Sequence, residues 1–234
     1  SKNKLKKLDP NLSNLKVLKS LNVDHNKLTP GSLNAIQSLP KLKSLSASHN
    51  LLGKRISVTP SSPSKPAPKP IDPSNALPKT LPKGLKTILL SSNGFRVIPT
   101  SLFESPLKML EKLDLSKNQL ATLPESISSL VKLNDLNLDD NDLESLPSSV
   151  GTLKYLKVLS LRNNQIANTK PQPLSKELWT DTPLIDLNLH GNPMTTTQLN
   201  TFEGYESFLK RRREVKNKDI LGGAMVDLEG CGLE

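Results

Sequence analysis

An eleven-residue pattern recurs along almost the whole chain and constrains the fold more than any other feature. Residues 110–120 read L-E-K-L-D-L-S-K-N-Q-L, with leucines at positions 1, 4, 6 and 11 and an asparagine at position 9. Further copies, the first of them partial, place an asparagine at Asn3, Asn26, Asn50, Asn93, Asn141, Asn164 and Asn192. Most copies follow one another at 23 to 25 residues, and two longer spacings measure 43 and 28. Such a period predicts a solenoid of stacked units.

The pattern also predicts how one unit is built. Its Leu-x-Leu core alternates as a short strand must to place alternate residues on one face. One repeat cannot bury its own leucines, so neighbours have to stack, with strands roughly 4.8 Å apart. The asparagine then turns inward, where a buried amide needs hydrogen bonds from the neighbouring turn. We therefore interpret the repeated asparagines as a structural ladder: Asn26, Asn50, Asn93, Asn118, Asn141, Asn164 and Asn192.

With these motifs the chain resembles the intracellular leucine-rich repeat family over nearly all of its length. Segments 123–130 and 146–153 read L-P-x-x-[IV]-x-x-L. That form is similar to the repeats of Ras-binding scaffold proteins and of the plant intracellular Ras-group-related class. The endings G-N-P at 191–193 and E-G-Y at 203–205 resemble those of small cytosolic proteins made only of such repeats.

The resemblance implies a curved, right-handed α/β leucine-rich repeat solenoid. A parallel sheet would line its concave face, and short helices and turns would form its convex face. It also implies a non-enzymatic scaffold or adaptor that binds another protein through the concave face, in intracellular signalling. A small GTPase, a phosphatase or a signalling complex would be the partner class.

The expected organisation is one repeat domain over residues 1–194, with about eight repeats. Residues 53–83 interrupt it with eight prolines among serines and lysines, which predicts a loop or polyproline-like excursion from the convex side. Thr59 and Ser62 each precede a proline and are candidate phosphorylation sites. The P-x-x-P spacings beginning at Pro60 and Pro63 fit docking by an SH3-type domain. The alternative is an insertion without a binding role.

Residues 195–218 are expected to form a helix that caps the solenoid. Leu199, Phe202, Phe208 and Leu209 fall roughly on one helical stripe, and terminal repeats need a cap with a polar outer face. Residues 219–234 carry little pattern and are expected to be a flexible tail. The only tryptophan, Trp179, is either a core residue or a partner-binding hot spot.

The expected capping helix at residues 195–218 also contains a basic run: Lys210, Arg211, Arg212 and Arg213. It is either a nuclear-import signal or phosphate-binding patch, or the solvated side of the capping helix.

The residues that the consensus leaves free, at positions 3, 5, 7 and 8, should project from the concave sheet. In the N-terminal copies they are mostly serines and other small polar residues, whereas the middle copies carry an acidic group. We expect this group to attract a basic partner; the alternative is a solvated face without a dedicated partner. The candidate contact residues are Lys112, Asp114, Lys117, Asp135, Asn137, Asp139, Asp140, Ser160, Arg162, Asp186, Asn188 and His190.

Catalysis and metal binding find little support in the sequence. The three histidines are His25, His49 and His190, and the first two should lie about 5 Å apart in adjacent repeats. They could share a metal with Asp24, but two histidines without a designed geometry make a weak metal site. No nucleophile elbow, oxyanion motif or phosphate-binding glycine loop is present. We therefore expect no cofactor, no metal and no enzymatic activity.

The net charge of +10 is unevenly distributed. Residues 1–84 hold 15 Lys and Arg against 3 Asp and Glu, and residues 85–234 hold 17 against 19. The basic third and the Pro/Lys insertion raise an alternative function, attachment to RNA or a ribonucleoprotein. Only 3% of residues are aromatic, so a platform for stacking bases is lacking and nucleic acid is the less favoured partner. One cysteine and the lack of a signal peptide or transmembrane run favour a cytoplasmic, or also nuclear, location.

Overall fold

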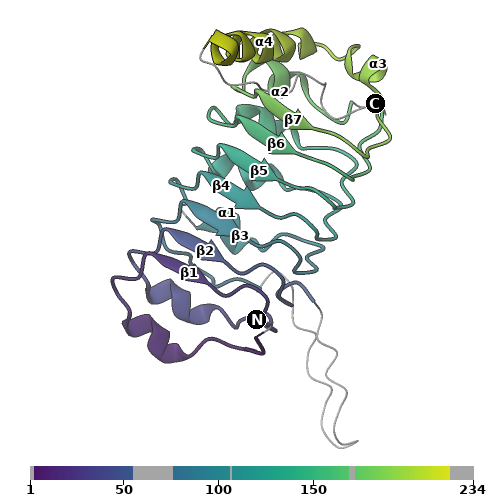
Figure 1. Cartoon of the computed structure of the whole chain (residues 1–234). Coiled ribbons are helices and arrows are strands. Elements are labelled where there is room, and N and C mark those ends of the chain that lie inside the picture. The colour runs from purple at the N-terminus through teal and green to yellow at the C-terminus, as the bar shows by residue number, and fades with distance from the viewer. Residues whose placement is uncertain (1–2, 55–75, 106, 169–171, 222–234) are drawn as a thin grey trace, which may run out of the picture.

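The computed structural model describes residues 3–54, 76–105, 107–168 and 172–221. Within these ranges the chain forms seven short parallel strands that pair in chain order (Figure 1). Each strand covers positions 3 to 5 of one repeat, and the residues at equivalent positions are in register. The strands are β1 (Ser20–Asn22), β2 (Ser44–Ser46), β3 (Thr87–Leu89), β4 (Lys112–Asp114), β5 (Asp135–Asn137), β6 (Val158–Ser160) and β7 (Asp186–Asn188).

Alternation along each strand separates the core from the free face of the sheet. The central residues Leu45, Ile88, Leu113 and Leu136 are fully buried, while their neighbours at positions 3 and 5 point to the other side. The leucines at positions 1, 6 and 11 fill the space behind the sheet and form one continuous core. The stacking of incomplete units thus supplies the burial that no single repeat provides.

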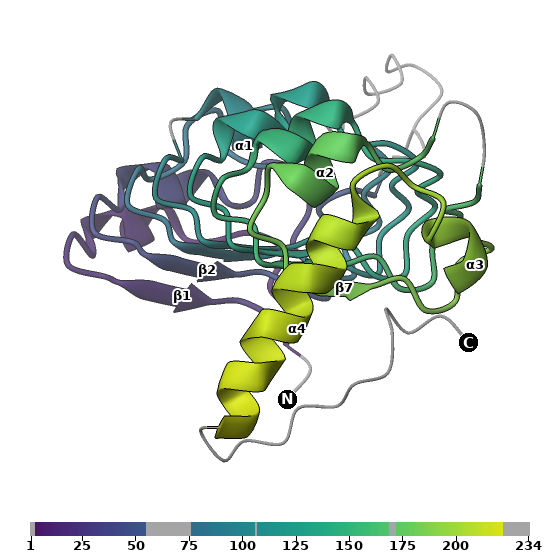
Figure 2. The same ribbon diagram turned by 90° about the horizontal axis from the view of Figure 1, so that it is seen from above.

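Short helical segments close the opposite, convex side (Figure 2). One of them is a 3-10 turn of five residues, η2 (Asn34–Ser38), with Ile36 buried. The other convex elements are η1 (Pro10–Asn14), α1 (Ser101–Glu104), η4 (Glu125–Ser129), η5 (Ser148–Thr152) and α2 (Lys176–Thr180). Because these segments take fewer than eight residues each, the repeats stay short enough to stack at the spacing of the sheet.

Asparagine side chains connect each repeat to its neighbours. The Nδ2 amide of Asn118 donates to the carbonyls of Leu90, Leu115 and Ser116, at 3.2, 2.7 and 3.0 Å. Its Oδ1 accepts from the backbone N–H groups of Asn93 and Phe95 at 3.0 and 3.1 Å. Equivalent bonds occur at the other ladder positions: Asn26, Asn50, Asn93, Asn141, Asn164 and Asn192.

The partial first copy contributes a turn but no strand to the described structure. Asn3 is exposed, whereas Leu5 donates its N–H to Oδ1 of Asn26, as Leu28 does to Asn50 one repeat later. The sheet of the described residues therefore begins at β1, and Asn3 takes no part in the ladder.

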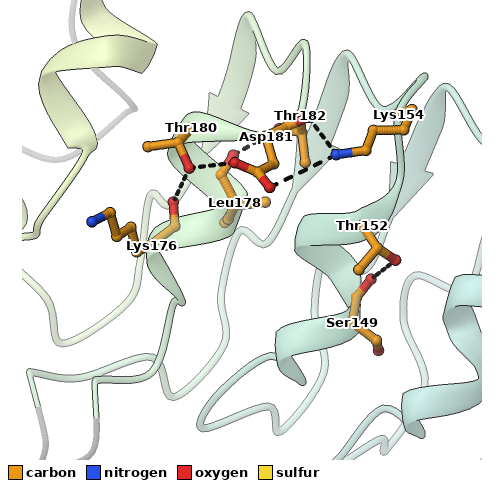
Figure 3. A network of polar contacts seen from close by, with 8 residues as sticks. All are labelled: Ser149, Thr152, Lys154, Lys176, Leu178, Thr180, Asp181 and Thr182. Carbon is orange, nitrogen blue, oxygen red and sulfur yellow. Dashed lines mark hydrogen bonds and ion pairs between the residues drawn. The ribbon is translucent and has the colours of Figure 1, made fainter.

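The convex elements η5 and α2 pack closely against each other (Figure 3). Thr182 donates its hydroxyl to the carbonyl of Leu178 at 2.7 Å, and Lys154 lies 3.7 Å from the carboxylate of Asp181. Gly151 sits in this contact, where a Cβ atom would lie only 2.5 Å from Cβ of Glu177. The absence of a side chain at this position therefore sets the distance between the two elements.

The insertion is narrower than the sequence indicated. Ala76, Leu77 and Leu81 are buried in the solenoid core, and Gly53 packs against the backbone of Phe95. Both flanks of the expected 53–83 excursion thus belong to the repeat domain, because apolar residues follow the prolines. The candidate phosphorylation sites Thr59 and Ser62 lie outside the described residues.

The C-terminal segment forms two helices where the apolar stripe predicted one. α3 (Thr196–Leu199) begins with a capping box between Thr195 and Gln198, and α4 (Tyr205–Leu221) follows. Residues 200–204 separate them, and Gly204, directly before α4, has a φ of +85°. Figure 2 shows α4 crossing the C-terminal end of the solenoid. None of the helices in the described part of the chain has the length and apolar character to cross a membrane.

Aromatic packing holds α4 in place. Trp179 of α2 is fully buried, with its ring centre 5.2 Å from that of Tyr205 and 6.0 Å from that of Phe208. Phe202 and Leu199 are buried beside them. Trp179 is thus a core residue, and its burial removes it as an exposed hot spot.

Candidate functional site

The free face of the sheet is built from the four positions that the repeat does not use for its core. Positions 3 and 5 flank the buried residue of each strand, and positions 7 and 8 follow where the strand ends. Position 8 adopts a left-handed backbone conformation, with φ between 52° and 56° at His25, His49, Ser92, Lys117, Asp140 and Asn163. Its N–H donates to the position-7 carbonyl of the next repeat, as from Lys117 to Asp139 at 2.8 Å. This bond fixes the turn in six successive repeats.

The acidic group falls on β4, β5 and the turns that follow them. Lys112 pairs with Asp135 across the two strands at 2.5 Å, and both side chains are partly exposed. Asp114 lies beside Asn137 in the register of the sheet. Strand spacing therefore keeps these groups within roughly 5 Å of their neighbours, on one surface.

Hydrogen bonds hold three of the carboxylates in fixed orientations. One oxygen of Asp139 accepts the backbone N–H of Arg162 at 2.7 Å, and one oxygen of Asp140 accepts the side-chain amide of Asn163 at 2.7 Å. Asp114 accepts the N–H of Ser116 at 2.9 Å. The sequence did not indicate these bonds. Those of Asp139 and Asp140 join neighbouring repeats, and that of Asp114 lies within one turn. They orient the acidic side chains while leaving them partly exposed.

The remaining candidate residues divide into supporting and exposed groups. Asn137 and Asn188 are half-buried, and each accepts the N–H two residues further on, from Asp139 and His190. Ser160 is half-buried as well. The exposed members are Lys112, Lys117, Arg162, Asp186 and His190.

Ser116 is buried and donates its hydroxyl to Ser91 at 3.0 Å, and Lys117 is exposed at position 8.

The N-terminal half of the face satisfies its own polar groups. Asp24 accepts the hydroxyl of Ser46 at 2.7 Å and the N–H of Ser48 at 2.7 Å. His25 and His49 stack with ring centres 4.2 Å apart and planes inclined by 9°, close to the spacing expected of adjacent repeats. Among the described residues no group of three or more His, Cys, Asp or Glu side chains is placed to hold a metal ion.

Sequence reasoning missed an exposed aromatic residue at the edge of the acidic group. Tyr155 is 55% exposed and lines a hollow of about 550 Å³ together with Glu111, Lys112, Lys132, Asn134 and Asp135. It occupies the position just before the first leucine of its repeat, where the preceding repeat has Lys132. The sequence did contain a feature that could have identified it, namely a tyrosine at a position where a solvated side chain is expected. Tyr155 therefore extends the acidic surface toward the rim of the sheet.

The four residues of the basic run of α4 differ in their surroundings. The guanidinium of Arg211 donates to the carbonyls of Trp179 at 2.6 Å and Leu184 at 3.3 Å, and partial burial lowers its pKa. Lys210 and Arg213 are exposed, and Arg212 is half-buried. One of the four predicted residues thus joins α4 to the last repeat.

Comparisons with known proteins agree with this architecture. Residues 83–143 match the family model described as leucine rich repeat. A leucine-rich repeat protein of Leptospira interrogans is 26% identical, with a TM-score of 0.56, over 97% of this chain and 53% of its own. Internalin C2 of Listeria monocytogenes is 20% identical with a TM-score of 0.58, over 82% of this chain and 71% of its own.

An internalin of the same organism, InlF, is 22% identical with a TM-score of 0.59, over 86% of this chain and 49% of its own. The chain thus spans about half the length of the Leptospira protein. No curated protein sequence matches it. The fold is a leucine-rich repeat solenoid, as the repeat pattern predicted.

Proposed function

We propose that this solenoid is a non-enzymatic module that binds a basic segment of another protein on its concave face, across β4 to β6. The observation that carries the proposal is the group of oriented carboxylates on β4, β5 and their following turns. We also propose that the module is an adaptor in intracellular signalling, with a small GTPase, a phosphatase or a signalling complex as its partner. This partner class is proposed because the repeats resemble those of Ras-binding scaffold proteins.

Electrostatics favour a basic partner over an acidic one. The free positions of β4 to β7 carry five aspartates against three cationic residues: Asp114, Asp135, Asp139, Asp140 and Asp186 against Lys112, Lys117 and Arg162. Carboxylates that are already oriented by hydrogen bonds lose little side-chain freedom when a cation binds. A surface of this charge also steers a basic partner during diffusion, so association should slow as salt increases.

Tyr155 adds an anchoring residue to this surface. Exposed tyrosines provide a large contact area with few rotatable bonds, and such residues are enriched among binding hot spots. Its position in the hollow beside Asp135 allows a guanidinium to contact the ring and a carboxylate together. The proposed interface therefore combines acidic residues with one aromatic anchor.

The test is affinity capture followed by quantitative mass spectrometry, with wild-type protein and a triple variant as baits. Asp135→Asn, Asp139→Asn and Asp140→Asn together remove three charges, while each asparagine keeps an acceptor oxygen for the bonds described above. We expect the variant to retain its unfolding midpoint and to lose the basic proteins that the wild type captures. Charge reversal would be less clear, because a lysine at residue 139 cannot accept the N–H of Arg162.

A matched control removes three charges elsewhere. Glu104→Gln, Glu144→Gln and Glu177→Gln alter exposed residues outside the free face of the sheet. We expect this control to capture the same proteins as the wild type. Equal capture by both variants, or equal loss in both, would show that the concave acidic group does not select the partner.

A further inference from the structure

Lysines gather along the edge of the solenoid at which the strands begin. We call this surface the lysine edge; in each copy it comprises the two residues before the first leucine and the one residue after it. Six copies contribute to it, and they begin at Leu18, Leu42, Leu85, Leu110, Leu133 and Leu156. Their edge positions hold one glutamate, Glu111, no arginine and ten lysines: Lys16, Lys19, Lys41, Lys43, Lys83, Lys86, Lys108, Lys132, Lys154 and Lys157.

Backbone hydrogen bonds place the members of the lysine edge side by side. The N–H of Lys43 donates to the carbonyl of Lys19 at 2.8 Å, and the N–H of Lys86 donates to that of Lys43 at 2.7 Å. The series continues through the next copies as far as Lys157, at 2.8 to 2.9 Å. Figure 1 shows the loops concerned stacked along one side of the solenoid, at the starts of the strand arrows. Neighbouring copies are therefore about 5 Å apart, and the edge extends over roughly 25 Å.

Most of the charge on the lysine edge is not neutralised within the protein. Lys86 is half-buried and pairs with Glu111 at 2.7 Å, and Lys154 lies 3.7 Å from the carboxylate of Asp181. The other eight lysines are exposed, and no carboxylate of the described residues lies within ion-pair distance of them. The edge is therefore strongly positive, in contrast to the acidic group on the adjoining concave face.

Exposed apolar side chains lie among these lysines. Val17, Met109, Val131 and Tyr155 occupy positions of the lysine edge, and their exposed fractions are 72%, 36%, 47% and 55%. They are four of the seven exposed large apolar residues in the described part of the chain. The ammonium of Lys132 lies 3.7 Å from the sulfur of Met109. Cationic and apolar side chains thus share one narrow surface.

We propose that the lysine edge binds peripherally to the surface of a bilayer that contains anionic phospholipid. Lysines near such a surface are attracted by the negative potential of the headgroups. Exposed aliphatic and aromatic side chains are stabilised when they enter the boundary between headgroups and acyl chains. The concave acidic group lies on the adjoining face, so the proposal goes beyond the protein-binding function and does not rest on it.

Single-stranded nucleic acid is the less suitable ligand. Its bases bind by stacking on several aromatic side chains, and Tyr155 is the only aromatic residue on the lysine edge. The edge also has no arginine, the residue whose planar guanidinium recognises phosphate in a fixed geometry. Lysines combined with valine and methionine fit a lipid surface better, because a bilayer offers an apolar phase and anionic groups together.

The test is co-sedimentation of the whole chain with vesicles of two compositions. One is phosphatidylcholine alone, and the other also contains about 30% phosphatidylserine, as in an anionic membrane surface. We expect a partition coefficient at least about tenfold higher for the anionic vesicles, and a decrease as salt screens the charges. Acetylation of lysines followed by mass spectrometry locates the contact: Lys41, Lys43 and Lys108 should react more slowly on anionic vesicles, and Lys27 and Lys79 should not.

A charge variant and a matched control test the lysines. Lys108→Gln, Lys132→Gln and Lys157→Gln together should lower the partition coefficient on anionic vesicles at least about tenfold. The control is Lys27→Gln, Lys79→Gln and Lys117→Gln, which removes three charges from exposed residues outside the lysine edge. It should stay within about twofold of the wild type, because salt screens charges that remain away from the surface.

An apolar variant tests the contact with lipid. Met109→Ser with Val131→Ser leaves the net charge unchanged and alters two exposed side chains. We expect the partition coefficient on anionic vesicles to fall about tenfold, because less apolar area enters the bilayer boundary. The unfolding midpoint of each variant, measured without vesicles, should match that of the wild type.

Several results would overturn the proposal. These are equal binding to both kinds of vesicle, equal weakening by the lysine variant and its control, and unchanged binding of the apolar variant. Single-stranded RNA or polyglutamate that binds the lysine edge more tightly than the anionic vesicles would assign it to nucleic acid or to an acidic protein instead. None of these variants alters a carboxylate of the concave face, so the outcome is independent of the function proposed above.

Discussion

At the scale of single residues, the turn after each strand depends on two neighbouring positions. Position 9 supplies the asparagine ladder, which the sequence pattern predicted. Position 8 takes a left-handed backbone conformation, which residues other than glycine adopt at a cost in free energy. Here the residue is histidine, serine, lysine, aspartate or asparagine. The repeated hydrogen bond to the next repeat offsets that cost. Such a mixture of residues carries no sequence signal, so the conformation could not be predicted.

Removing a ladder asparagine should destabilise the solenoid. Asn118→Ala deletes a buried amide and leaves the N–H groups of Asn93 and Phe95 without their acceptor. We expect a loss of about 1–3 kcal/mol in the free energy of unfolding, the usual cost of unpaired buried groups. Chemical denaturation of the wild type and the variant, analysed with the same m-value, measures this loss.

The control replaces the asparagine at the same position of the repeat in the partial first copy. Asn3 heads the partial copy but is exposed, so Asn3→Ala should leave the denaturation midpoint unchanged. Equal midpoints for wild type and Asn118→Ala would contradict the role of the ladder.

At the scale of elements, the strands and their register followed from the repeat. Leucines at fixed positions can be buried only when the strands align as observed, so the sheet and core could be predicted. The break between α3 and α4 could not be predicted, because the apolar stripe continues past Gly204 as it would in one uninterrupted helix. The bonds of Asp139 and Asp140 also escaped prediction, since they depend on the distance between neighbouring turns.

Gly151 tests the packing of η5 on α2. Gly151→Ala places a Cβ atom 2.5 Å from Cβ of Glu177 and 2.9 Å from its carbonyl carbon. The two elements must then separate, and we expect a loss of about 1–3 kcal/mol, as for other overpacked sites. Thermal and chemical unfolding measure it. Gly84→Ala is the control, because its Cβ would stand 3.5 Å from the nearest atom; an equal effect at both glycines would contradict the packing argument.

At the scale of the whole molecule, the two ends of the solenoid differ. The C-terminal end is covered by α4 through Trp179, Tyr205 and Phe208, whereas β1 at the other end has no covering element among the described residues. Each repeat contacts mainly its neighbours, so stability is a sum of repeats and the interfaces between them. Loss of a cap should therefore be felt first in the repeat beside it.

Phe208→Ala tests this expectation. The ring is fully buried between Trp179 and Tyr205, and its removal should cost about 3–5 kcal/mol at that end of the solenoid. Hydrogen exchange followed by mass spectrometry should show faster exchange in α4, α2 and β7, with β2 to β4 close to wild type. Glu214→Ala, at an exposed position of α4, should change neither region. Equal acceleration in every strand would mean that the solenoid unfolds as one cooperative unit, and the nearest-neighbour description of its stability would then be wrong.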